Sequence, residues 1–158
     1  MQKAGQVMNI YSDIDTKATT KNVDYFLSKK LPHIILRCGH SITELSSPKL
    51  SLTPVSTSRR TDLQESIIIN AIEFEHVVQA VHSSIFLCSN ISKTILIDKY
   101  IRNYPVKRIV MDIPYEYTSF YKKFLPSALL EFADLYSGQQ LKCKVSKENL
   151  IDLHIYKD

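Results

Sequence analysis

The chain has 158 residues and a net charge of +4, and 44% of its residues are hydrophobic and 23% charged. This length is typical of one domain or two small ones, and it is sufficient to bury an apolar core. Its three glycines lie far apart, and this excludes the Gly-rich phosphate loops of P-loop and dinucleotide-binding proteins. Three cysteines without a close pair fit a reducing cytoplasm, and no apolar run reaches the roughly 20 residues of a membrane span, so we expect a cytoplasmic protein without a membrane partner.

The first forty residues predict a small N-terminal helical segment. Val23, Phe26 and Leu27 recur at helical spacing, and Pro32 and Gly39 suit the first turn and the end of a second helix. The stretch that follows, residues 41–60, is different, because 11 of its 20 residues are Ser, Thr or Pro. Such a segment has little apolar surface to bury, so we expect a linker and a domain boundary there.

A long helix is predicted from Thr61. Thr61 and Gln64 form a capping box, and behind it apolar residues recur every three or four positions. The apolar residues are Leu63, Ile67, Ala71, Phe74, Val78, Val81 and Ile85. Residues 61–98 contain five acidic residues and one basic residue, and they lie between two basic stretches. DNA interacts with the charge on one face of a protein and not with its net charge, so the separation into basic and acidic stretches bears on DNA binding.

Three further helices are predicted in an order typical of helix-turn-helix proteins. The first follows the long helix directly, the second spans residues 105–112, and Pro114 places a tight turn after it. The third spans residues 116–136, with a kink or break expected near Pro126 because proline removes a helical hydrogen bond. Residues 61–136 are therefore predicted to form a helix-turn-helix domain whose last helix enters the DNA major groove.

Beyond Gly138 the hydrophobic period changes from the helical one to two. The alternating apolar residues are Leu141, Cys143 and Val145 in one run and Ile151, Leu153 and Ile155 in another. We expect a β-hairpin over residues 137–158. The predicted fold class is thus mainly α: a helix-turn-helix domain with a small N-terminal helical segment (residues 1–40) and a C-terminal β-hairpin.

The start of the predicted third helix carries the candidate residues for reading DNA bases. Hydroxyl and ammonium groups bond base edges in the major groove, whereas cations at the rim contact phosphates and set the register. The candidate base-reading residues are Tyr117, Thr118, Ser119, Tyr121 and Lys122, and the candidate phosphate contacts are Arg102, Lys107, Arg108 and Lys123. Phe120 and Phe124 are expected to anchor this helix to the core. No catalytic residue, metal or cofactor is predicted.

Several short segments resemble the ArpU-like family of phage and prophage transcriptional regulators. They are TKNVDYFL (residues 20–27), LSSP (45–48), ILIDKYI (95–101), SFYKK (119–123) and ALLEFADLY (128–136). The resemblance implies a helix-turn-helix similar to region 4 of sigma factors. It also implies binding to double-stranded promoter DNA and activation of phage late genes for packaging, morphogenesis or lysis in the bacterial host cytoplasm. Host RNA polymerase and a second regulatory protein are further partners that it suggests.

The chain departs from the family pattern at the start of this helix. Pro114, Tyr115 and Glu116 stand where the family usually has Gly-Tyr-Ser, so the serine cap is lost. Pro126 also replaces a residue compatible with helix. These differences affect the expected docking angle and not the expected class.

Four other interpretations compete with DNA binding by a helix-turn-helix. The acidic helix from Asp62 favours a protein–protein adaptor that binds host RNA polymerase or another regulator without promoter specificity. Cys38 and His40 form a possible nucleophile pair, but no carboxylate is apparent to orient it. Zinc binding would use Cys38, His40, His82 and Cys88, which lack the usual ligand spacing. Stacking on single-stranded bases would use Tyr115, Tyr117, Phe120 and Tyr121.

Overall fold

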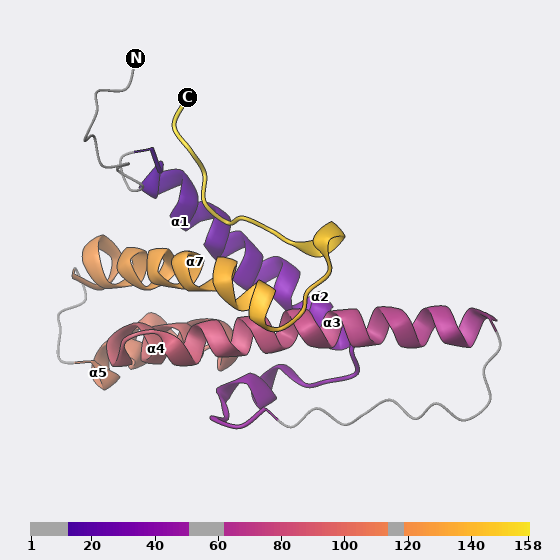
Figure 1. The fold of residues 1–158 in the computed structure, drawn as a ribbon. Helices are drawn as coiled ribbons and strands as arrows, with labels where there is room; N and C mark the ends of the chain where they lie inside the picture. The colour runs from indigo at the N-terminus through magenta and orange to yellow at the C-terminus, as the bar shows by residue number, and fades with distance from the viewer. Residues whose placement is uncertain (1–12, 51–61, 114–118) are drawn as a thin grey trace, which may run out of the picture.

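The structure, a computed structural model, describes residues 13–50, 62–113 and 119–158, and these residues are mainly helical (Figure 1). The α-helices are α1 (Thr16–Tyr25), α2 (Leu31–Arg37), α3 (Asp62–Leu87), α4 (Asn90–Leu96), α5 (Val106–Asp112) and α7 (Leu125–Lys142). Short π-helical turns, η1 (Phe26–Lys30), η3 (Ile97–Ile101) and η4 (Phe120–Phe124), join α1 to α2, extend α4 and lead into α7. Two 3-10 turns, η2 (Ile42–Ser46) and η5 (Lys147–Asn149), complete these elements.

Helix α7 packs against α1, α3 and α4 (Figure 1). Its inward side buries Phe132 and Tyr136, whose rings stack with centroids 5.4 Å apart. The ring centroid of Phe26 in η1 lies 6.5 Å from that of Phe132 and 5.4 Å from that of Tyr136. The mainly helical prediction is confirmed, and helices from the predicted N-terminal segment and from the predicted helix-turn-helix domain contribute to one hydrophobic core. No helix in the described part of the chain is apolar over enough residues to cross a lipid bilayer.

The first part of the predicted linker is folded. Residues 42–46 form η2, capped by Ser41 and Glu44, and Leu45 is buried with 1% exposure. His82 on α3 lies 2.6 Å from the carbonyl oxygen of Ser47 through Nε2, which attaches the end of this segment to the long helix. Ser and Thr here supply caps and turns, and a single leucine anchors them to the core. Residues 51–60, and Thr61 of the expected capping box, lie outside the described residues.

The expected β-hairpin over residues 137–158 is wrong. α7 continues through Gly138 to Lys142, and the described residues beyond it contain η5, extended backbone and one isolated bridge between Ile14 and Tyr156. The buried Gln140 explains the difference, because its side-chain amide accepts from the N–H of Ile151 (2.8 Å) and donates to its carbonyl (2.7 Å). The side-chain amide of Gln140 thus satisfies the backbone groups of Ile151 that a neighbouring strand would satisfy in a hairpin.

The expected interruption near Pro126 takes the form of a change of helix type. Residues 120–124 form the π-helical turn η4, and α7 begins at Leu125 with Pro126 in its first turn. Pro126 lies at one of the first two positions of α7, where proline is more frequent than in a helix interior. The helix therefore continues through Pro126 instead of ending at it.

His154 fastens the C-terminal tail to α7. Its Nε2 lies 2.7 Å from Oδ1 of Asp134 on α7, and its Nδ1 lies 2.7 Å from Oδ1 of Asp152. Tyr156 donates a hydrogen bond to the other oxygen of Asp152, at 2.6 Å. Partial burial by itself disfavours the charged imidazole, but the hydrogen bonds and negative charges of the two aspartates outweigh it, so the pKa of His154 is raised.

Replacing Phe132 with alanine tests the aromatic core. Phe132→Ala removes a fully buried ring that packs on two others, so we expect the free energy of unfolding to fall by about 3–5 kcal/mol. Urea unfolding followed by circular dichroism measures the change. Leu141→Ala on the same helix is the matched control, because Leu141 is 65% exposed and its loss should change stability by less than about 0.5 kcal/mol. Similar losses for both variants would contradict this account of the core.

Replacing His154 with glutamine tests the attachment of the tail. The folded pKa lies above the unfolded value of about 6.5, so the contribution of His154 to stability is complete below that pH. It is lost as pH rises through the folded pKa. We therefore expect His154→Gln to destabilise the protein most at pH values just below about 6.5. Urea unfolding at a series of pH values measures this, and a difference that grows with rising pH would contradict it.

Candidate nucleic-acid interface

The first turns of the helix that leads into α7 carry exposed polar side chains. Phe120 is fully buried and holds these turns to the core, while Tyr121, Lys122 and Lys123 are exposed. The Tyr121 ring lies edge-on to Phe120 with centroids 5.1 Å apart, so its position is set by the anchor beneath it. Ser119 is half-buried at the start of these turns. The remaining base-reading candidates, Tyr117 and Thr118, lie outside the described residues.

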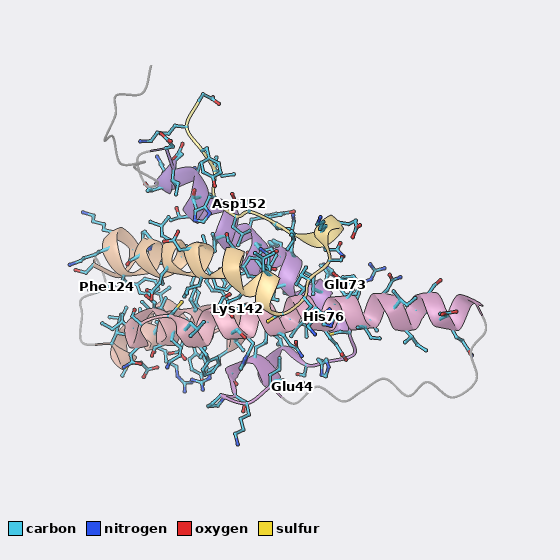
Figure 2. All side chains as sticks on the ribbon, in the orientation of Figure 1. Glu44, Glu73, His76, Phe124, Lys142 and Asp152 are labelled. Atoms are coloured by element: carbon cyan, nitrogen blue, oxygen red, sulfur yellow. The ribbon has the colours of Figure 1, made fainter. Side chains whose placement is uncertain are left out.

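α5 and the start of this helix lie at the same end of the molecule. Figure 1 shows both at one end, and Figure 2 shows Phe124 there, with Lys142 at the far end of α7. α5 exposes Lys107 and Arg108, so the same end carries cations from two elements. Within the described residues, neither Lys107 nor Lys122 forms an ion pair. Their charges are therefore available to an anionic partner.

Tyr104, in the turn before α5, positions two of the cationic side chains. The guanidinium of Arg108 lies 3.8 Å from the centroid of its ring, and that of Arg102 lies 5.8 Å away. Stacking of this kind restricts the arginine without using its hydrogen-bond donors. Arg108 therefore keeps its N–H groups for a phosphate while its plane is held by the tyrosine.

Arg102 has a structural role that the sequence did not reveal. Its Nη1 donates to Oδ1 of Asp98 at 3.0 Å, and Asp98 is only 1% exposed. Oδ2 of Asp98 has no hydrogen-bond partner among the described residues. Burial raises the pKa of Asp98, the nearby Asp112 raises it further, and Arg102 opposes the shift. The four-residue spacing of Asp98 and Arg102 was visible in the sequence, but such spacing usually indicates a surface pair.

The start of the helix that leads into α7 exposes Tyr121, Lys122 and Lys123. From Ala128 onward the inward side chains of this helix belong to the core, where they pack against α1, α3 and α4. α5 packs against η3, and the turn that would join it to the next helix, residues 114–118, lies outside the described residues. The helix-turn-helix therefore stays a prediction.

The cysteine and histidine candidates do not come together as a reactive site. Burial raises the pKa of Cys38, whose thiol donates to the carbonyl of Ile35, and His40 lies 2.8 Å from Glu44 and 3.5 Å from Glu75. These properties disfavour a Cys38 thiolate. Burial likewise raises the pKa of Cys88 to about 12. Among residues 13–50, 62–113 and 119–158, no group of three or more His, Cys, Asp or Glu side chains is arranged to hold a metal ion.

Comparison with known proteins gives no match. No protein-family model matches the chain, and no curated protein or solved structure does so either. Function is therefore inferred from the chemistry of the exposed residues described above.

Removing the Arg102 side chain separates its structural role from phosphate binding. Arg102→Ala removes the cationic partner of the buried carboxylate of Asp98, so we expect a loss of about 1–3 kcal/mol in the free energy of unfolding. Lys107→Ala is the matched control, because this exposed lysine has no ion pair among the described residues and should change stability by less than about 0.5 kcal/mol. Urea unfolding compares the two variants. A loss for Arg102→Ala as small as that of the control would show that the pair is not structural.

Proposed function

We propose that the chain is a sequence-specific regulator of transcription that binds double-stranded promoter DNA, related to the ArpU-like phage regulators that its sequence resembles. The observation that supports this is the cationic end of the molecule. There, α5 and η4 expose Lys107, Arg108, Lys122 and Lys123, with Tyr121 among them. The proposal involves no catalysis and no cofactor.

The cationic side chains suit the DNA backbone. Lysines and arginines that neutralise phosphates release counterions, so binding should weaken steeply as salt increases. Lys107 and Arg108 come from one element and Lys122 and Lys123 from another, which allows contacts on both sides of a groove. Arg102 contributes less, because Asp98 offsets its charge.

The residues around Tyr121 suit the bases. A major groove about 12 Å wide admits one helix, and the exposed start of this helix carries a hydroxyl and an ammonium group next to a buried anchor. Tyr121 and Lys122, with Ser119, Tyr117 and Thr118, are proposed to read the sequence. Late-gene activation and contact with host RNA polymerase follow from the family resemblance and are part of the proposal.

Alanine variants distinguish phosphate contacts from base contacts. We expect Lys107→Ala and Arg108→Ala to weaken binding to all duplexes alike and to reduce the salt dependence by about one unit of slope each. Tyr121→Ala should cost about 1–3 kcal/mol on the cognate duplex and little on a scrambled one. Footprinting on late-promoter DNA first identifies the site, and gel shifts on both duplexes then measure the changes.

Lys142→Ala is the matched control for these variants. Lys142 is exposed at the far end of α7, so its loss should leave DNA affinity unchanged (Figure 2). Equal losses on both duplexes for Tyr121→Ala would remove this residue from the base-reading set. Binding to polymerase without affinity for any duplex would contradict the proposal and favour the adaptor alternative.

A further inference from the structure

The N-terminal half of α3 extends beyond the other helices (Figure 1). Ile67, Ile69 and Ile72 are 60%, 59% and 40% exposed, and five of the six residues from 67 to 72 are apolar. With about 100° between successive residues, Ile67 and Ile69 point to nearly opposite sides of the helix. Isoleucine side chains are therefore exposed on two sides of this projecting half, next to polar residues that include Glu65. Clustered exposed apolar side chains of this kind mark an interaction surface.

A basic and aromatic groove lies at the base of the projecting half, where η1 and α2 meet α3. Its volume is about 410 Å³, and it is lined by Tyr25, Lys29, Lys30, His33, Ile34, Arg37 and Phe74. The guanidinium of Arg37 lies 5.3 Å from the ring centroid of Phe74 on α3. Within the described residues, Lys29, Lys30 and Arg37 form no ion pair. The groove thus offers apolar walls and available positive charge.

A second cavity of about 340 Å³ adjoins the same part of α3. Phe74 and Val77 of α3, Ile34 of α2 and Ile151 of the tail supply its apolar lining, and Glu73 and Glu148 also line it. The groove and this cavity share Ile34, Arg37 and Phe74 in their linings, so they form one continuous surface. Apolar side chains from a second helix would fill this space.

The projecting half and the groove carry opposite charges. The projecting half contains Asp62 and Glu65 and no Lys or Arg, and Glu65 is exposed. The groove contains two lysines, an arginine and a histidine. The projecting half is acidic and apolar, and the groove is basic and apolar. The two surfaces are therefore complementary.

We propose that two copies of the chain form a symmetric dimer in which the projecting halves of α3 pack antiparallel and each reaches the groove of the other copy. An isologous two-fold contact is the commonest arrangement of homo-oligomers, and it uses both complementary surfaces twice. Antiparallel packing brings the N-terminal end of one α3, with Glu65, towards Phe74 and Arg37 of the second copy. A stable interface buries about 800 Å² on each partner, which is more than three isoleucines provide, so the groove must take part. This inference does not rest on DNA binding.

Sedimentation equilibrium of the full chain over a dilution series tests the dimer. The wild-type chain should be dimeric, and Ile69→Lys and Ile72→Lys should each raise the dissociation constant by roughly 30-fold or more. Both residues are exposed, so circular dichroism should show that the variants fold. Leu141→Lys is the matched control, because it changes an exposed apolar residue elsewhere and should leave the dimer intact. A monomeric wild-type chain, or isoleucine variants as dimeric as the control, would overturn the proposal.

Charge reversal tests which surfaces meet. Glu65→Lys alone and the double variant Lys29→Glu/Lys30→Glu alone should each be largely monomeric, because each places like charges at both contacts. Mixing the two variants should restore dimers, since both contacts of the mixed pair are then complementary. Failure of mixing to restore dimers would overturn the arrangement. A monomer whose α3 amides at residues 64–72 exchange slowly with solvent would also overturn it.

Discussion

The packing of Phe26 against Phe132 and Tyr136 joins the N-terminal helices to α7 near the other end of the sequence, and the core forms around this contact. It holds η1 against α7, and α7 in turn contacts α1, α3 and α4. The start of the helix that leads into α7 lies at one end of the molecule, where Phe120 anchors the turn that carries the exposed Lys122 and Lys123. α2, which follows η1 directly, packs against α3, and the basic groove lies where they meet. Both proposed surfaces therefore lie on elements next to this aromatic cluster.

Helical periodicity predicted the α-helical character of most of the chain, and the structure confirms this character. The predicted β-hairpin is wrong because the alternation of apolar and polar residues after Gly138 does not reveal what these residues pack against. Leu141 and Cys143 belong to the end of α7, where Leu141 faces solvent, and the extended tail pairs with a side-chain amide of Gln140. Composition alone suggested a linker at residues 41–60, but one buried leucine with a capped turn is enough to fold residues 42–46. Neither interaction has a sequence period, so neither was predictable from pattern.

The exposed cations of the candidate site were predictable, whereas their neighbours were not. Lys107, Lys122 and Lys123 are exposed as their residue types suggest. The burial of Asp98 depends on how η3 and α5 meet, which brings Asp98 near Asp112 and makes Arg102 a counterion. Similarly, Ile67 belongs to the apolar stripe that predicted α3, but only the three-dimensional arrangement shows that this stripe extends past the core.

The two proposals together place a constraint on DNA recognition. The cationic end and the projecting half of α3 lie at opposite ends of the molecule (Figure 1), and the acidic helix is repelled by phosphates. α3 has 26 residues and is therefore about 39 Å long. Two copies that overlap only along the projecting halves would hold their cationic ends apart by on the order of 60 Å. Half-sites one helical turn apart, about 34 Å, are too close for this dimer, so it would require sites separated by at least two turns.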